Sequence, residues 1–342
     1  MMVFYGDVNL PYLDISNSKL QENIEKNINI FNFESTIVEC DTVVTDGIAL
    51  RSKPDVVRNF FELGFGVACL ANNHTSDYND SITSTISNLN NVGFRTYGAG
   101  ENLEHASKHL KISLNGIDHY FIAAGWDVIG CKYASEKKPG VNPYCSSKLK
   151  KAVEDIRLID EKAVIYCTFH YNYEFELYPQ PADRLLFHEL IDLGADYIIG
   201  HHSHLVGPYE RYKGKYIFYS LGNFYMPEVI SRGYRLKYPE VAYHGISVDL
   251  SDLIPKVHFY QTVDNTIKYI ESKQIDKSDL IDLCELVGKE DYLLWFNKNR
   301  KKKKLLPVFT NYNNKFDTRF KANLVKFRNY LINFSVRLKL KK

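Results

Sequence analysis

Short apolar runs alternate with amphipathic segments along the first 265 residues. A β-rich apolar run of four to seven residues predicts a buried strand, and apolar spacings of three and four predict a helix. Strands that alternate with helices in this way indicate an α/β domain. The predicted strands are Val3–Gly6, Asn29–Phe33, Phe65–Leu70, Tyr120–Ala124, Ala163–Phe169, Tyr197–Ile199 and Tyr216–Leu221. The predicted helices are Pro54–Leu63, Ser81–Val92, Ser147–Asp160 and Ala182–Leu193.

The pattern changes after residue 265. Residues 267–296 are polar and are predicted to be helical, and a basic run follows at 298–304. Beyond Pro307, large apolar residues recur at spacings of three and four, which predicts one apolar stripe along a helix. The stripe consists of Phe316, Phe320, Leu324, Phe327, Leu331, Phe334 and Leu338. We therefore expect a main domain over 1–265, a helical extension over 266–310 and a basic amphipathic helix over 311–342.

Composition narrows the class of protein. Apolar residues make up 45% and charged residues 25% of the 342, which excludes a mainly disordered chain. The longest apolar runs fall short of the roughly 20 residues that a spanning helix needs, and the first residues lack a signal-peptide pattern. The six cysteines are scattered without a C-x-x-C pair, which is typical of reduced thiols. We therefore predict a cytoplasmic protein.

The near-neutral net charge of +2 hides an asymmetry. Residues 292–342 hold 15 Lys or Arg and one acid, so the first 291 residues hold 28 basic and 40 acidic residues. A basic helix with a Phe and Leu stripe suits an anionic membrane surface, and we predict such a contact through residues 316–342 at the inner face of the membrane. The alternatives are packing of the stripe on the main domain or self-association. Nucleic-acid motifs are missing from the sequence, and we expect no nucleic-acid partner.

Residues of metal-binding type follow several of the predicted strands. A lone Asp after a strand is commonly a turn residue or a helix cap, but three histidines within residues 201–204 are costly to bury unless they are paired or bind a metal. In open α/β sheets, ligands bind beyond the carboxyl ends of the strands. Carboxylate, imidazole and amide ligands together favour Mn, Fe or Zn. The candidates are Asp7, Glu34, Asn73 with His74, His170, and His202 with His204.

Seven segments, in order along residues 3–260, carry a family resemblance. They are Tyr5–Val8, Asn32–Thr36, Leu70–Tyr78, Tyr97–Gly100, Phe169–Phe175, Gly194–His204 and Tyr219–Phe224. Together they resemble the CapA family of poly-γ-glutamate capsule biosynthesis, which is related to the calcineurin-like metallophosphoesterases. The resemblance implies a four-layer α/β/β/α sandwich with two divalent ions, Mn, Fe or Zn. Such a pair lowers the pKa of bound water toward about 7.

The resemblance also implies roles for individual residues. One metal would be held by Asp7 and His204, Glu34 would bridge, and the second metal would be held by Asn73, His170 and His202. His74 would act as a general acid or as a donor to the transition state. Asp77 and Glu174 would lie near the catalytic group or face the substrate, and Asn9, His201 and Asn223 would contact it. Apart from the resemblance, Arg51 stands before a predicted helix and could clamp an anionic substrate, and the alternative is an ordinary surface arginine.

Two departures separate this sequence from ordinary phosphoesterases. Asn9 stands where those enzymes place a histidine ligand, and Glu34 replaces a bridging aspartate. In addition, Tyr171-Asn172 stands where the CapA family usually has Trp-Gly. Our first hypothesis is a metal-dependent hydrolase or accessory factor that acts on an anionic polymer or phosphoester in making an envelope polymer. The alternatives are a non-catalytic, membrane-associated scaffold of a polymer synthase and a generic cytosolic metallophosphoesterase.

Overall fold

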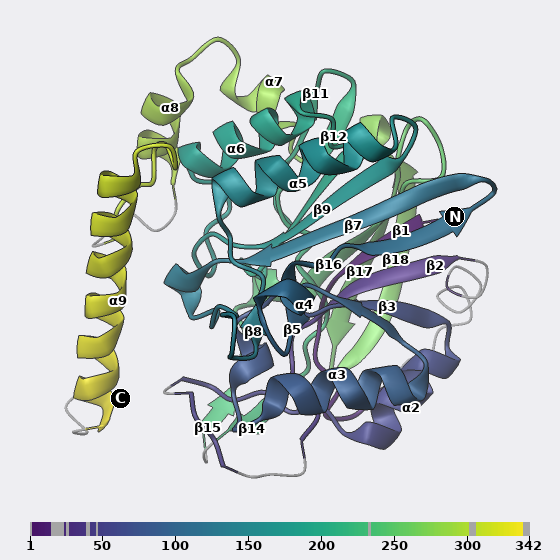
Figure 1. Ribbon diagram of the computed structural model, residues 1–342, viewed down its shortest axis with the longest axis vertical. Helices are drawn as coiled ribbons and strands as arrows, with labels where there is room; N and C mark the ends of the chain where they lie inside the picture. Colours follow the sequence, from purple (N-terminus) through teal and green to yellow (C-terminus); the bar gives the residue numbers. More distant parts are fainter. Residues whose placement is uncertain are drawn as a thin grey trace.

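The computed structural model is a sandwich of two β-sheets with helices on the outer faces (Figure 1). It describes residues 2–14, 24, 27–38, 42–45, 47–231, 234–300 and 306–337. The first sheet has the order β18-β17-β16-β1-β2-β3-β4, with β13 paired to β1. Its strands are β1 (Met2–Val8), β2 (Ile28–Phe33), β3 (Phe65–Cys69), β4 (Arg95–Tyr97), β13 (Asn223–Tyr225), β16 (His244–Asp249), β17 (Lys256–Val263) and β18 (Thr266–Gln274).

The second sheet has the order β11-β12-β10-β9-β7-β6. Its strands are β6 (Leu110–Leu114), β7 (Ile117–Gly125), β9 (Val164–His170), β10 (Tyr197–His201), β11 (Tyr209–Tyr212) and β12 (Lys215–Phe218). Strands β7, β9, β10 and β12 run parallel, as do β1, β2, β3 and β4 in the first sheet. Shorter elements are β5 (Ala99–Gly100), β8 (Gly140–Val141), β14 (Val229–Ser231), β15 (Tyr234–Leu236) and α4 (Leu103–Ser107).

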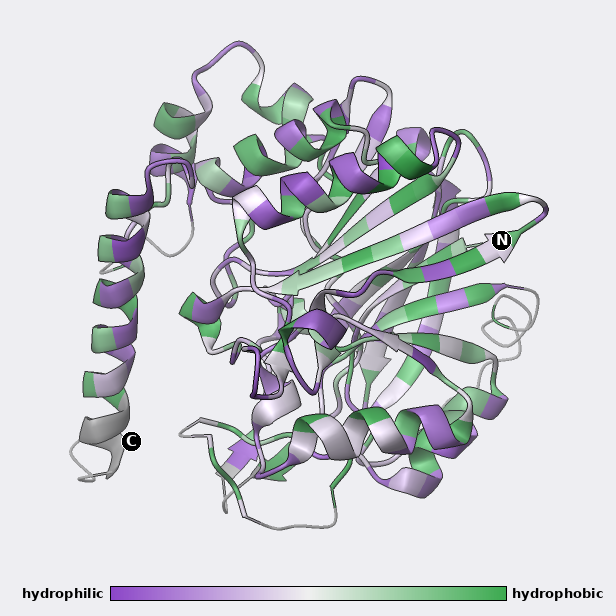
Figure 2. Cartoon of the chain, in the orientation of Figure 1, coloured by the Kyte–Doolittle hydropathy of each residue, from purple (hydrophilic) through white to green (hydrophobic). Residues whose placement is uncertain are grey.

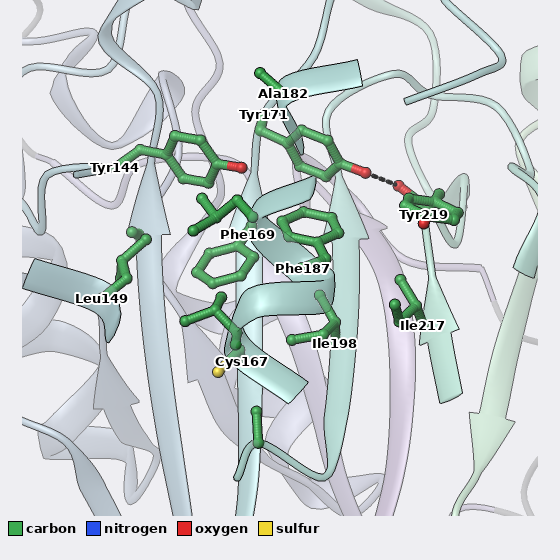
Figure 3. Packing of buried hydrophobic residues seen from close by; sticks show 14 of the residues in the cluster. Tyr144, Leu149, Cys167, Phe169, Tyr171, Ala182, Phe187, Ile198, Ile217 and Tyr219 are labelled. Atoms are coloured by element: carbon green, nitrogen blue, oxygen red, sulfur yellow. Dashed lines mark hydrogen bonds between the residues drawn. The ribbon is translucent and has the colours of Figure 1, made fainter. Parts of the chain in front are cut away.

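Helices complete the four layers. Helices α2 (Pro54–Glu62) and α3 (Ser81–Val92) cover the first sheet, and α5 (Ser146–Ile159) and α6 (Pro181–Asp192) cover the second (Figure 1). Figure 3 shows one buried cluster, in which Phe169 and Ile198 of the second sheet lie beside Phe187 of α6. Separate apolar clusters fill the space between the sheets and the space under α2 and α3. The expected α/β/β/α sandwich is confirmed.

The predicted elements of the first 221 residues match observed ones within a few residues, but the helical prediction for the start of 267–296 is wrong. Residues Thr266–Gln274 form strand β18, paired antiparallel with β17. Asp264 and Asn265 both have positive φ angles, 49° and 62°, which is the backbone of a two-residue hairpin turn. In β18, Ile267 is buried while Lys268 is exposed, so the segment follows the period of a strand.

Short helices follow β18 in place of one long helix. They are the 3-10 turn Ile275–Lys277, α7 (Leu283–Val287) and α8 (Tyr292–Asn299). Gly288, with a φ of 58°, ends α7. In α8, Trp295 and Phe296 are buried against the body. Residues 301–304 of the predicted basic run lie outside the described residues.

The predicted C-terminal helix is α9 (Lys315–Arg337), which stands beside the body (Figure 1). Figure 2 shows apolar and polar residues alternating along it. Val325 is buried in the cluster that also contains Trp126 and Phe309, so α9 packs on the body through this side chain. Phe327 lies two positions after Val325, which places it on nearly the opposite side of the helix, and it is 61% exposed.

The apolar stripe of α9 therefore faces away from the body. Phe316, Phe320, Leu324 and Leu331 are all exposed as well. Leu338 and the side chain of Phe334 lie outside the described part of the chain. Among the helices of the described residues, none is long and apolar enough to cross a membrane.

Candidate metal centre

The six predicted metal ligands meet at one edge of the sandwich. Asp7 lies near the end of β1, Glu34 directly follows β2, and His170 ends β9. Asn73 follows β3, while His202 and His204 follow β10. Ligand atoms of Asp7, Glu34 and His170 lie within 4.8 Å of one another, and so do those of Glu34, His202 and His204. Parallel strands place their carboxyl ends together, which explains how segments distant in sequence converge.

Asp7 is fully buried in a network of donors. Its Oδ1 accepts hydrogen bonds from Asn32 Nδ2 at 2.8 Å and from the His201 ring at 3.0 Å, and His204 Nδ1 lies 3.4 Å from its Oδ2. Burial raises the pKa of Asp7, but the hydrogen bonds and charges of His201 and His204 outweigh it and hold the pKa well below its usual range. Asp7 is therefore an anion, which is the form that binds a metal.

Asn32 is a site residue that the sequence analysis missed. Its amide also lies 3.3 Å from His170 Nδ1, so it connects the two sides of the site. Its signal in the sequence was weak: a polar residue facing inward two positions before Glu34, inside a segment of the family resemblance.

Glu34 is the least satisfied group in the site. Both of its carboxylate oxygens are buried and have no hydrogen-bond partner among the described residues. Its Oε1 lies 3.5 Å from His170 Nε2, 3.8 Å from His74 Nε2 and 3.9 Å from His204 Nε2. Burial, followed by the negative charge of Asp7, raises the pKa of Glu34 to about 8. Because an unpaired buried carboxylate is costly, these residues fit a divalent cation.

Ring nitrogens of two histidines and one amide oxygen face the same space. His170 Nε2 lies 2.6 Å from Asn73 Oδ1 and 3.1 Å from His202 Nδ1, so two imidazoles and an amide oxygen converge. Burial holds the pKa of both His170 and His202 well below the usual range, which keeps the rings neutral. His202 has a φ of 88° and His204 a φ of 57°, a backbone region that non-glycine residues rarely adopt. Such strain is typical of functional sites.

His204 shows the opposite electrostatic balance. Burial lowers its pKa, but the negative charges of Glu34 and Asp7 raise it further, to about 10. Its Nδ1 also lies 2.8 Å from Asn223 Oδ1. A protonated ring between two buried carboxylates shows that the carboxylates attract positive charge, which a metal ion would also supply.

His74 and Asp77 form a pair beside this cluster. His74 Nδ1 lies 2.7 Å from Asp77 Oδ2, and the same carboxylate oxygen accepts from the backbone N–H of Leu50 at 2.8 Å. Burial lowers the pKa of His74, but the charge of Asp77 outweighs it and the pKa is raised. Both residues line an open cleft of about 690 Å³, together with Glu174, Asn73, His202 and His204. The cleft therefore opens directly onto the cluster of candidate metal ligands.

The four predicted substrate contacts do not line this cleft. Asn9 Oδ1 accepts from the Ser35 hydroxyl at 2.8 Å, and Asn223 and His201 are buried behind the ligands that they touch. The Arg51 guanidinium donates to the carbonyl of Val38 at 2.5 Å. In the described structure these side chains support the loops around the site.

Glycines allow the strands to approach closely behind the ligands. A Cβ on Gly200 would lie 2.1 Å from the carbonyl oxygen of Tyr219, and a Cβ on Gly6 would lie 2.1 Å from the carbonyl oxygen of Gly222. Both distances are far below contact distance, so a larger residue would push these strands apart. Gly6 precedes Asp7 and Gly200 precedes the His201–His204 segment, so the glycines help to set the positions of the ligands.

A two-sheet sandwich with carboxylates and histidines gathered at one edge is the arrangement that the resemblance to metallophosphoesterases implies. The sequence profile of the family described as bacterial capsule synthesis protein PGA_cap matches residues 12–228, and the chain belongs to this family. It is 32% identical over 181 residues to the capsule biosynthesis protein CapA of Bacillus anthracis, covering 52% of this chain and 44% of that protein. It is 33% identical over 181 residues to the PGA biosynthesis protein CapA of Bacillus subtilis (strain 168), covering 52% and 47%.

The chain thus matches less than half the length of these two relatives. Among solved structures, a 5'-nucleotidase precursor from Thermus thermophilus superposes with a TM-score of 0.39 at 13% identity, covering 80% of this chain and 53% of that chain.

Proposed function

We propose that this protein is a metal-dependent hydrolase that serves the biosynthesis of a capsule or related envelope polymer. The observation that carries this proposal is Glu34, whose two buried carboxylate oxygens lack hydrogen-bond partners among the described residues while three histidine rings lie within 4 Å. Membership of the capsule synthesis family supports the polymer as the setting. The bond that is cleaved would be a phosphoester or an amide-like bond.

In this proposal the ligands divide as the family resemblance implies. Asp7 and His204 would hold one ion, Asn73, His170 and His202 the other, and Glu34 would bridge. Mn, Fe or Zn suits this set of nitrogen and oxygen ligands. When bound, two such ions would provide a water of lowered pKa and would polarise the bond to be cleaved.

The chain's own residues would then complete the reaction. His74, held by Asp77, faces the cleft beside Glu34 and would donate a proton to the leaving group. Asp77 would orient the ring and keep it protonated, because its charge raises the pKa of His74. Glu174 lies exposed on the wall of the cleft and would contact the substrate.

The alternative is a non-catalytic scaffold of a polymer synthase. Asn9 favours it, because this side chain stands at a ligand position of ordinary phosphoesterases and its oxygen is bonded to Ser35. Incubation of metal-loaded protein with bis(p-nitrophenyl) phosphate, and separately with oligo-γ-glutamate, tests the choice. Metal-dependent cleavage of either would contradict the scaffold, and failure to cleave any phosphoester or γ-glutamyl amide would contradict the hydrolase. Broad cleavage of simple phosphoesters alone would indicate a generic phosphoesterase.

We also propose that the protein works from the cytoplasm at an anionic membrane surface. The exposed stripe of α9 supports this contact, since Phe316, Phe320 and Phe327 lie on the face turned away from Val325. Lys315, at the start of α9, provides positive charge near the stripe. A polymer synthase in the same membrane would be the natural partner.

A further inference from the structure

Helix α9 forms one side of the cleft that leads to the metal-ligand cluster. The ligand side of this cleft includes Asn73, His74, His202 and His204, and the α9 side consists of Val325, Lys326, Arg328, Asn329 and Tyr330. A helix close to the C-terminus therefore contributes side chains to a site whose candidate ligands all come from the first 204 residues.

The body holds this part of α9 in place. Val325 is buried in the apolar cluster with Trp126, and Lys326 forms an ion pair with Asp127. Asp127 belongs to the 3-10 turn Asp127–Ile129, which follows β7 at the same edge of the sheet. The segment before α9 is also anchored, because the hydroxyl of Tyr173 donates to the carbonyl of Pro307 at 3.0 Å. These contacts with the body therefore fix the position of the α9 side chains that line the cleft.

Arg328 differs from the other cation on this wall. The ammonium of Lys326 is paired with Asp127, whereas Arg328 has no acidic partner within ion-pair distance among the described residues. One guanidinium nitrogen of Arg328, Nη1, donates to Asn329 Oδ1 at 3.1 Å, and the side chain is half-buried. A guanidinium has five donors in a planar fork that matches a carboxylate or a phosphate. Most of its hydrogen-bonding capacity is thus available to a ligand in the cleft.

We propose that Arg328 is an anion-binding residue of the substrate site, so that the cleft takes a linear polyanion that lies between the metal ligands and α9. The substrate class is a chain that carries several carboxylates or phosphates, because one anionic group would be needed at Arg328 while the bond to be cleaved lies at the ligands. This inference rests on the proposed function for its substrate, but it concerns binding rather than cleavage. Lys326 has a positioning role, since its ion pair holds α9 against the turn.

The experiment measures binding of two polyanions to the full-length, metal-loaded protein by titration calorimetry. The probes are oligo-γ-glutamate, which is a carboxylate chain, and tripolyphosphate, which separates the two sources of negative charge. The R328A variant should bind its preferred probe about ten-fold more weakly, and R328K should recover part of the loss. The matched control is R319A, which removes the same charge from an exposed position of α9 outside the cleft and should change binding less than about two-fold.

Three outcomes would overturn the inference. The first is that the wild type binds neither probe, and the second is that R328A binds as tightly as the wild type. The third is that R328A and R319A weaken binding equally, because equal effects would indicate long-range charge alone. R328Q serves as a second variant if R328A unfolds or loses metal. Cleavage assays keep the two proposals apart. If binding depends on Arg328 but no substrate is cleaved, the hydrolase proposal is contradicted and the Arg328 site is upheld. If substrate is cleaved but R328A binds the probes as the wild type does, the hydrolase proposal is upheld and the Arg328 site is contradicted.

Discussion

At the scale of single residues, the site is defined by ionisable side chains that are buried close together. Glu34 is buried without a hydrogen-bond partner among the described residues, and its pKa is raised to about 8 by burial and by Asp7. His204 is held protonated between the same carboxylates. Burying a carboxyl group without hydrogen bonds is unfavourable for stability. In the described part of the chain, Glu34 has two unsatisfied oxygens on one carboxyl group and three histidine rings within 4 Å, which fits a bound cation.

His74 provides the first prediction at this scale. The H74A variant should keep its metal and lose about 100-fold in the rate of phosphoester cleavage, because it lacks the proton donor. D77N should lose less, since Asp77 acts through the His74 ring at 2.7 Å. The measurement is the rate of cleavage beside metal content, with the exposed His105 replaced in H105A as the matched control. Full activity in H74A, or loss of metal from it, would remove His74 from the proposed role.

Asp183 gives a prediction for pH that is independent of metal. This buried carboxyl accepts from the hydroxyls of Tyr144 at 2.9 Å and Tyr312 at 2.6 Å, and burial, which these bonds only partly offset, raises its pKa to about 7. Between the unfolded value near 4 and pH 7, the folded state binds the extra proton, so stability falls as pH rises. D183N cannot lose a proton in this window.

The expected result is a change in relative stability with pH. The free energy of unfolding of D183N minus that of the wild type should increase by about 2 kcal/mol between pH 5 and pH 7.5. Denaturant titrations across this range measure the difference directly. A difference between the two proteins that stays constant with pH would show that Asp183 is ionised throughout.

At the scale of elements, most of the fold follows from local patterns. The buried parallel strands β9 and β10 are continuous apolar runs, and α2 and α6 begin with Pro54 and Pro181 at their first turns. The strand β18 could not be recognised in this way, because its polar, half-exposed face resembles that of a surface helix. The turn at Asp264-Asn265 was the local signal for it.

The glycines behind the ligands give a prediction about elements. G200A should be destabilised by about 3 kcal/mol or more, because its new Cβ would meet the carbonyl of Tyr219 at 2.1 Å in the neighbouring segment. G66A is the matched control, since Gly66 lies in strand β3 and nothing lies within 4 Å of the position of a Cβ there. Denaturation midpoints of both variants test this. Equal stability of the two would contradict the close approach of β10 to the segment after β12.

At the scale of the whole molecule, sequence reasoning located the candidate ligands better than it located the cleft. Asp7, Glu34 and the histidines follow strands whose ends meet, so their convergence could be anticipated from the order of elements. The position of Arg328 on the cleft wall could not be anticipated from the sequence. No local signal in α9 shows that Val325 packs on the body and thereby places Arg328 at the cleft. Likewise, Arg51, Asn9, His201 and Asn223 looked accessible in sequence, and only the packing shows that they lie behind the site or beside it.

The outer face of α9 gives a prediction for the whole molecule. The double variant F320S/F327S should bind vesicles that contain phosphatidylglycerol at least roughly ten-fold more weakly than the wild type, because two exposed aromatic side chains are lost from the stripe. L158S/I159S removes two residues that are 85% and 81% exposed near the end of α5, and it should bind normally. Co-sedimentation measures both. Equal binding by all three proteins would contradict the membrane contact.

The central claim is that the six ligands hold metal, and elemental analysis of the purified protein tests it most directly. The wild type should contain about two ions of Mn, Fe or Zn per chain, and the H202A/H204A double variant should lose them while remaining folded. One ion per chain would contradict the dinuclear arrangement. No metal in the wild type, and none taken up on titration, would contradict the metal centre itself and with it the proposed hydrolase.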